Sequence, residues 1–260
     1  MNTLRGTFDE DAELYDRMRP RYPADLVTDL VVLTGLTSWS RVLEEGPGTG
    51  QLTVPLAELG CEVTAVELGP SLAAVARRNL RGFPRAHVEV SPFEEWTPPS
   101  EPFDLVVCAT AIHWIDPALR FTRAADALRT GGALAIVTTH HVAGGSGKFF
   151  EQAQRCYERW DPATRPGIEL SDEASTETVF GEMEHPPWGG PVRVRRHGRE
   201  ITYPAEQYPD LLMTYSGHRD LAPDARHGLL ACIRTLIDEQ HGGSITKRYL
   251  HELLTVRKAA

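Results

Sequence analysis

Between residues 24 and 139, segments with apolar residues at helical spacing alternate with short, continuous apolar runs. Apolar residues recur at helical spacing over 24–34, 51–59, 70–80 and 117–130, and we expect Gly131 and Gly132 to end the last of these helices. Short apolar runs, which predict buried strands, occupy 41–45, 61–68, 87–91, 103–110 and 133–139. Regular alternation of strand and helix predicts a doubly wound parallel sheet, whose ligands bind beyond the carboxyl ends of the strands.

The flanking segments have different patterns. Residues 1–24 are polar and helix-like up to Pro20, whereas 142–190 are rich in Gly, Pro and Trp around a helix at 148–160. Residues 191–203 have an alternating, strand-like pattern, and we expect a turn at His197–Gly198 to fold them into a hairpin. Helices are predicted near 205–215 and 223–239, and 245–257 fit either a strand or a helix. We therefore expect four parts: a cap segment over 1–24, a core over 25–141, a cap insertion over 142–190, and further strands and helices over 191–260.

Three glycines, Gly46, Gly48 and Gly50, follow the first strand directly. Glycine permits positive φ and close approach of the backbone to a ligand at a helix N-terminus. Gln51 occupies the place of the third glycine in the dinucleotide fingerprint, and the Lys–Ser/Thr pair of a P-loop is absent. The loop therefore predicts a nucleoside site without a pyrophosphate, where Glu44 or Glu45 could accept hydrogen bonds from an amine.

Glu67 ends the second predicted strand. A carboxylate at this place can accept hydrogen bonds from both hydroxyls of a ribose. The alternative is a glutamate that caps the next helix or faces solvent. After a glycine loop, the ribose interpretation is favoured.

Several motifs occur in a familiar order: VLEEGPGTGQ, VTAVEL, FDLVVCATAIHWID and ALRTGGALAIV, with FDEDAELYDRMRPRYP before them and TYSGHRDL and ITKRYL after them. In this order the chain resembles the class I S-adenosylmethionine (SAM)-dependent methyltransferases. The nearest likeness is to the small-molecule branch of type 11 and trans-aconitate methyltransferase-like proteins. The resemblance implies an α/β, Rossmann-like, doubly wound and mostly parallel seven-stranded sheet. It also implies an α-rich cap formed by the N-terminus and the insertion after the fifth strand.

The same resemblance implies SAM as cofactor and S-adenosylhomocysteine as its product. Pro92 has no N–H where the family commonly places an Asp–Ala-like pair, so the adenine edge falls to the next two residues. The implied cofactor residues are Glu44, Gly46, Gly48 and Gly50 at the methionine end, Glu67 at the ribose, Leu68 and the Phe93 backbone with Glu94 at the adenine, the Ala109 and Thr110 backbone at the methionine amine, and Tyr15 and Arg19 closing the site, with Arg19 at the SAM carboxylate.

Methyl transfer from a sulfonium is an in-line displacement that requires orientation and exclusion of water, and no metal is expected. His113 follows a buried strand at the crevice and is the best candidate for a base; the alternative is that it packs beneath the cofactor. His140 or His141 could contact the acceptor or serve as a second base, because one of the two faces inward. Seven aromatic residues either line an acceptor pocket or form core: Phe149, Phe150, Trp160, Trp188, Tyr203, Tyr208 and Tyr215.

Charge and cysteine content limit the partners. The net charge is −9, which disfavours nucleic acid and anionic membranes, and the basic run Arg193–Arg199 is interpreted as a solvated hairpin face. The four cysteines lie far apart in sequence, so we expect buried, reduced thiols and a cytoplasmic location. The N-terminus lacks the apolar core of a signal peptide, and no segment approaches the roughly 18 apolar residues of a membrane span.

The expected function is SAM-dependent methylation of a small molecule at O, N or C, with secondary metabolism as one setting, by a monomer or homodimer. One alternative is a SAM-binding protein that catalyses another reaction, such as a cyclisation. A second is an NAD(P)-dependent oxidoreductase, which Gln51 disfavours, and a third is a methyltransferase for macromolecules, which the charge disfavours.

Overall fold

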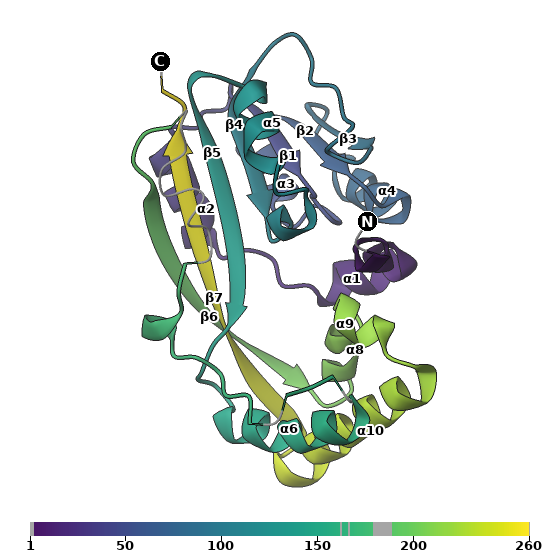
Figure 1. The fold of residues 1–260 in the computed structure, drawn as a ribbon. Helices are drawn as coiled ribbons and strands as arrows, with labels where there is room; N and C mark the ends of the chain where they lie inside the picture. Colours follow the sequence, from purple (N-terminus) through teal and green to yellow (C-terminus); the bar gives the residue numbers. More distant parts are fainter. Residues whose placement is uncertain (1–2, 162, 166, 179–188, 260) are drawn as a thin grey trace. The chain divides into compact units, whose positions relative to one another are not determined.

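The computed structural model describes residues 3–161, 163–165, 167–178 and 189–259 (Figure 1). The chain divides into two compact units. Unit 1 comprises Met1–Arg19, His140–Glu177 and Gly198–Leu250, and unit 2 comprises Pro20–Thr139, Thr178–His197 and His251–Ala260. Among the described residues, no helix is both long and apolar enough to cross a bilayer.

Seven strands form one sheet in the order β3-β2-β1-β4-β5-β7-β6. The strands are β1 Arg41–Glu45, β2 Glu62–Glu67, β3 Ala86–Val90, β4 Phe103–Ala109, β5 Leu128–His141, β6 Arg193–Pro204 and β7 Ser244–Arg257. The pairs β1–β2, β1–β4, β2–β3 and β4–β5 are parallel. Figure 1 shows β7 running opposite to its neighbours β5 and β6. The order reverses between β1 and β4, and in a parallel sheet such a reversal leaves a ligand crevice at the carboxyl ends of the strands.

The helices of unit 2 are α2 Ala24–Thr34, α3 Thr53–Glu58, α4 Pro70–Asn79, the 3-10 turn η2 Ile112–Trp114 and α5 Arg120–Ala127. The first has the predicted bounds, whereas the helices predicted over 51–59, 70–80 and 117–130 are shorter than predicted, and the 3-10 turn was not predicted. Helix α2 buries Leu26, Leu30 and Leu33 on one face and ends at Gly35, whose φ of 71° is the left-handed C-cap conformation. Pro70 is the first residue of α4, where its missing N–H has no cost.

The helices of unit 1 are η1 Thr3–Asp11, α1 Ala12–Met18, α6 Gly147–Trp160, η3 Glu173–Ser175, α8 Tyr208–Leu212, α9 Ser216–Asp220 and α10 Pro223–Gln240. Their shared core contains Phe149, Phe150, Tyr203 and Tyr208, so these four of the predicted acceptor-pocket aromatics are buried core residues. Trp160 packs at the edge of the same core. Trp188 and part of the 142–190 segment lie outside the described residues.

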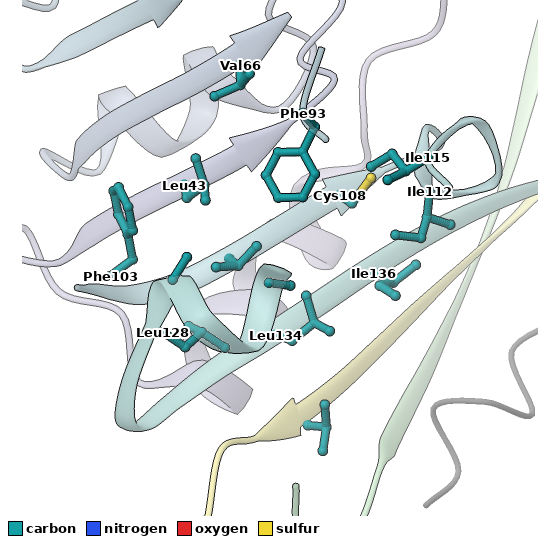
Figure 2. Packing of buried hydrophobic residues seen from close by; sticks show 14 of the residues in the cluster. Leu43, Val66, Phe93, Phe103, Cys108, Ile112, Ile115, Leu128, Leu134 and Ile136 are labelled. Atoms are coloured by element: carbon teal, nitrogen blue, oxygen red, sulfur yellow. The ribbon is translucent and has the colours of Figure 1, made fainter. Parts of the chain in front are cut away.

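The core of unit 2 covers both faces of the sheet because successive strand residues point to opposite sides. Leu43, Val106 and Cys108 belong to one cluster, whereas Val42, Leu105 and Val107 belong to the other. Figure 2 shows the first cluster, with the Phe93 ring among Leu43, Cys108 and Ile115. This packing holds the loops after β3 and β4 against the ends of the strands.

The predicted glycine break before the fifth strand is wrong. Strand β5 begins at Leu128, opposite Phe103, and the pairing then shifts so that Ala133 lies opposite Leu105. The extra residues form a bulge that contains both glycines. A Cβ on Gly132 would lie 2.9 Å from the Arg129 carbonyl oxygen, so the glycine permits the bulge and does not end the element.

The predicted hairpin at His197–Gly198 is also wrong, because β6 runs unbroken through both residues. His197 is 7% exposed, and its ring nitrogens lie 3.2 Å from Asp25 and 3.4 Å from Asp29 of α2. Arg196 forms an ion pair of 2.9 Å with the buried Glu252. The run is therefore partly engaged in ion pairs and is not a solvated hairpin face. Residues 245–257, for which strand and helix were both open, are the strand β7.

Two of the four cysteines are not reduced thiols. Cys156 of α6 and Cys232 of α10 form a disulfide, whereas Cys61 and Cys108 are free and buried. Sequence separation does not reveal this pairing, because the fold of unit 1 brings the two helices together. The cysteines therefore give no support to the predicted cytoplasmic location.

Candidate active site

The glycine loop follows β1 at the point where the strand order reverses. Gly46, Gly48 and Gly50 have φ values of 66°, 61° and 99°, a region that other residues rarely adopt. The Gly46 N–H donates to the Val66 carbonyl at 2.9 Å, and a Cβ on Gly46 would lie 2.7 Å from the Ala111 Cβ. The loop is therefore closed against the ends of β2 and β4, and only glycine fits at its first position.

The Glu67 carboxylate holds this loop from the end of β2. Its Oε2 accepts a hydrogen bond from the Gly48 N–H at 2.9 Å, and its Oε1 accepts one from the Gly69 N–H at 2.8 Å. The residue is only 6% exposed. A carboxylate can accept about four hydrogen bonds, and one held at the end of this strand is chemically suited to hydroxyl groups of a ligand. Glu67 is thus neither a simple helix cap nor a solvent-facing residue.

Glu44 lies beside Glu67 and is 1% exposed. Burial raises the pKa of Glu44 to about 8; the Thr53 hydroxyl opposes this shift and the Glu67 charge adds to it. Among the described residues, its Oε2 has no hydrogen-bond partner. A buried carboxyl oxygen without a donor is costly, and this one would be satisfied by a cationic or amine donor of a ligand.

Glu45 points to the other face of the sheet. It is fully buried opposite Cys108 in the β1–β4 register, and burial raises its pKa well above the usual value. Neither of its carboxyl oxygens has a hydrogen-bond partner within the described part of the chain. Cys108 belongs to the apolar cluster, and two charged residues also act on the pKa of Glu45: Glu94 raises it and Arg123 lowers it. Of the two acids left open by the sequence, Glu44 therefore lies beside Glu67, and Glu45 lies beneath the loops.

The loop after β3 packs inward. The Phe93 side chain is 4% exposed and stacks on Trp96 with ring centroids 6.4 Å apart, which leaves its backbone as the part available to a ligand. Glu94 Oε1 accepts a hydrogen bond from the Asp116 N–H at 3.2 Å. Leu68 is half-buried. The loops after β2, β3 and β4 all belong to unit 2.

A polar network that sequence reasoning missed lies at the end of β4. Thr110 has a φ of 58°, which is strained for a β-branched residue, and its hydroxyl bonds to Tyr22 at 2.8 Å and to Thr139 at 3.2 Å. The Thr139 hydroxyl also forms a hydrogen bond with His251 Nδ1 at 2.9 Å, so the network extends to His251. The one visible signal was Tyr22 between two prolines; the other partners come from β5 and β7. The adjacent Ala109 is 9% exposed.

The sequence over residues 42–132 matches the family described as the methyltransferase domain. An uncharacterized methyltransferase of Mycobacterium tuberculosis is 37% identical over 123 residues, which are 47% of this chain and 48% of that protein. The matched segment lies within unit 2. The chain spans about half the length of the curated relatives that it matches.

Solved structures share the fold of the whole chain. The YcgJ protein of Bacillus subtilis has a TM-score of 0.56 at 16% identity, covering 92% of this chain and 100% of that chain. Phosphoethanolamine N-methyltransferase 2 of Haemonchus contortus was solved with phosphomonomethylethanolamine and S-adenosylhomocysteine. It has a TM-score of 0.56 at 15% identity, and the match covers 100% of this chain and 61% of that chain. At such identities the likeness shows the fold alone. The predicted Rossmann-like class I methyltransferase fold is confirmed.

His113 lies on η2, directly after the strained end of β4 in the methyltransferase domain. Its side chain is exposed, and its ring centroid is 4.9 Å from that of Trp114. An exposed imidazole at this edge is accessible to a ligand, which fits both a base and a residue that packs beneath the cofactor. Its role as a base stays a prediction.

Three of the predicted site residues, Tyr15, Arg19 and His140, belong to unit 1 and not to the methyltransferase domain. The Arg19 guanidinium donates to the Thr214 carbonyl at 2.7 Å and lies 4.3 Å from the ring centroid of Tyr215 and 5.1 Å from that of Tyr15. His140 is half-buried. Their roles at a cofactor or acceptor stay predictions.

Arg19 belongs to a group of cationic and tyrosine side chains, which we call the cation–tyrosine cluster: Tyr15, Arg19, Tyr203, Tyr215, Lys247 and Tyr249. Lys247 is 6% exposed, donates to the Tyr215 hydroxyl at 3.3 Å and lies over the rings of Tyr215 and Tyr249. Burial opposes ionisation of Tyr215, but the charges of Lys247 and Arg19 outweigh it and lower the pKa of Tyr215.

The charge of Lys247 in this cluster also acts on His141, whose imidazole stays neutral. Burial first and the Lys247 charge second lower the pKa of His141 to about 3. Its ring packs edge-on against Phe150 with centroids 4.4 Å apart. Of the two adjacent histidines, His141 is therefore poorly suited to take up a proton at neutral pH. Within the described residues, no group of three or more His, Cys, Asp and Glu is placed to hold a metal ion.

Proposed function

We propose that this protein transfers the methyl group of SAM to a small-molecule acceptor. The observation that carries the proposal is the Glu67 carboxylate, which is fixed by Gly48 and Gly69 beside a loop of three glycines with positive φ. This arrangement presents a hydroxyl-binding acid next to a buried glycine loop at the switch point of a parallel sheet. It lies within the matched methyltransferase domain.

The residues present fit SAM. The unpartnered, buried oxygen of Glu44 suits the α-ammonium group of the methionine moiety, and Glu67 suits the ribose hydroxyls. The Phe93 backbone, Glu94 and Leu68 would hold the adenine, and the strained backbone at Ala109 and Thr110 would face the methionine moiety. When bound, SAM supplies a methyl group on a cationic sulfur. The Haemonchus protein of this fold binds S-adenosylhomocysteine, which supports the same cofactor class here.

A small acceptor is favoured over a nucleic acid on charge. The net charge is −9, and within the basic run Arg193–Arg199 the residues Arg196 and His197 lie against Glu252 and Asp25. The cation–tyrosine cluster offers unit 1 a compact set of aromatic faces and hydroxyls, which suits acceptor recognition better than any extended surface. His113 is the group we propose to accept a proton where the acceptor loses one.

Glu67→Ala tests the cofactor site. We expect SAM affinity to fall about ten- to a hundredfold in calorimetry, since a charge-assisted pair is lost and the glycine loop loses its anchor. Glu62→Gln is the matched control, because Glu62 lies on the same strand but forms an exposed ion pair with Arg41 at 3.0 Å. Unchanged affinity in Glu67→Ala would refute the ribose assignment.

The transfer itself is tested with SAM labelled in its methyl group. The pure protein is incubated with a small-molecule extract, and products are separated by size. Label in a small organic product supports the proposal and identifies the acceptor. SAM binding without transfer from a demonstrably active extract would favour a reaction other than methylation, and label in RNA or protein would refute the small-molecule assignment. His113→Ala should slow transfer while SAM affinity stays within about twofold.

A further inference from the structure

A pocket of about 600 Å³ lies between α6 and α10 of unit 1, and none of the residues assigned above to the cofactor or to catalysis lines it. The Cys156–Cys232 disulfide joins the two helices, and both cysteines line the pocket. Trp160 forms part of its wall and packs so closely on α10 that a Cβ on Gly228 would lie 2.5 Å from the indole ring. The helix pair therefore holds the disulfide at the surface of a defined cavity.

The two cysteine residues differ in exposure. Cys156 is 4% exposed and belongs to the core of unit 1, whereas Cys232 is half-buried at the edge of that core. A nucleophile that enters the pocket therefore meets Cys232 first. Exchange proceeds through attack by a thiolate on one sulfur while the other leaves, so this geometry sets the direction of attack.

The charged groups of the pocket are mostly basic. Arg155 and Arg159 lie one turn apart on α6, His227 lies on α10, and Glu239 is the lining carboxylate. The Arg159 guanidinium lies 5.1 Å from the ring centroid of Trp160. In the described part of the chain, neither arginine has a carboxylate within 4 Å, so both are available to an anionic ligand.

We propose that this pocket binds a low-molecular-weight thiol that carries carboxylate groups and exchanges it with the Cys156–Cys232 disulfide. The thiolate of the ligand forms a bond to Cys232 Sγ while the bond between the two cysteines breaks, and Cys156 leaves as a thiolate. Arg155 and Arg159, on the same helix as Cys156, pair with the carboxylate groups of the ligand. A second thiol releases a small disulfide and leaves both cysteines reduced, so two thiols supply the two electrons.

The test uses the intact protein with glutathione as the acidic probe and 2-mercaptoethanol as the neutral one. Rates of adduct formation are followed by intact-mass spectrometry after acid quench and are normalised to the thiolate concentration of each reagent. We expect glutathione to react about tenfold faster than 2-mercaptoethanol, and peptide mapping to place the adduct on Cys232. Equal normalised rates, an adduct on Cys156, or purification of the protein with two free thiols would overturn the proposal.

Arg155→Met combined with Arg159→Met separates binding from general reactivity. The glutathione rate should fall to that of 2-mercaptoethanol, while the 2-mercaptoethanol rate should change less than about twofold. Arg234→Met is the matched control, because Arg234 is an exposed residue of α10 outside the pocket. A glutathione rate that is insensitive to the double substitution would show that the arginines do not bind the thiol. Thermal unfolding of each variant checks that α6 and α10 remain packed.

Discussion

The glycine loop of unit 2 and the cation–tyrosine cluster of unit 1 arrange polar groups in opposite ways. The loop uses backbone N–H groups and two buried acids, Glu44 and Glu67, from neighbouring strands. The cluster uses side-chain cations and phenols from four segments of the chain, with Arg19 and Lys247 both packed on Tyr215. The first region is electronegative and the second electropositive.

This difference shows how each region attains its geometry. In the loop, the main chain positions the groups, so a change of backbone conformation should abolish the site. In the cluster, side chains position one another, and a single substitution should alter the ionisation of its neighbours while the fold persists. The following substitutions test this contrast.

The largest effect is expected at Gly46. Gly46→Ala places a Cβ 2.7 Å from the Ala111 Cβ at a φ of 66°, which should cost roughly 2–5 kcal/mol of stability and reduce SAM affinity more than about a hundredfold. Gly82→Ala is the control, because nothing lies within 4 Å of a Cβ there. Denaturant unfolding and calorimetry report both effects. Equal tolerance of the two substitutions would contradict backbone control of the loop.

The next effect concerns Glu44 and depends on pH. The folded protein retains a proton on Glu44 up to about pH 8, whereas the unfolded chain releases it near the usual glutamate pKa of 4.5. The unfolded state therefore binds fewer protons between these limits, and stability falls as pH rises, by up to about 1.4 kcal/mol per pH unit.

Glu44→Gln should remove this slope and also weaken SAM binding. Glu45→Gln is the comparison, because Glu45 is equally buried with a raised pKa but faces the apolar cluster. It should reduce the pH slope and leave SAM affinity within about threefold. Unfolding free energies at pH 5, 6, 7 and 8, with calorimetry of both variants, distinguish the two acids. A loss of SAM affinity only in Glu45→Gln would reverse their assignment.

The smallest effect on stability is expected in the cluster. Lys247→Met removes the cation that donates to the Tyr215 hydroxyl, so the pKa of Tyr215 should rise by about one unit or more while the protein stays folded. Ultraviolet titration of tyrosinate measures this shift, and Tyr215→Phe identifies the component that titrates first. Lys148 is an exposed residue of α6, so the control variant Lys148→Met should leave the tyrosinate titration unchanged. An identical titration in Lys247→Met would show that Lys247 does not stabilise the phenolate.

The local elements of this protein were determined by its sequence. The apolar runs predicted β1 to β4, and the leucines of α2 and the glycine after it predicted that helix to the residue. The glycines after β1 and the acid at the end of β2 could be recognised because adjacent residues and strand ends set their positions. The doubly wound, seven-stranded fold followed from the order of these elements together with the family resemblance.

Only the tertiary structure decided the features that depend on distant partners. The alternation over 191–203 fits a hairpin and a single long strand equally, and pairing along β7 together with burial of His197 against α2 selected the strand. Glu44 and Glu45 are adjacent in sequence, yet strand geometry directs them to opposite faces of the sheet. The Cys156–Cys232 bond and the stacking of Lys247 on Tyr215 join segments that no local period relates. Local patterns specify backbone conformation, whereas pairing, burial and charge follow from which segments the folded chain brings into contact.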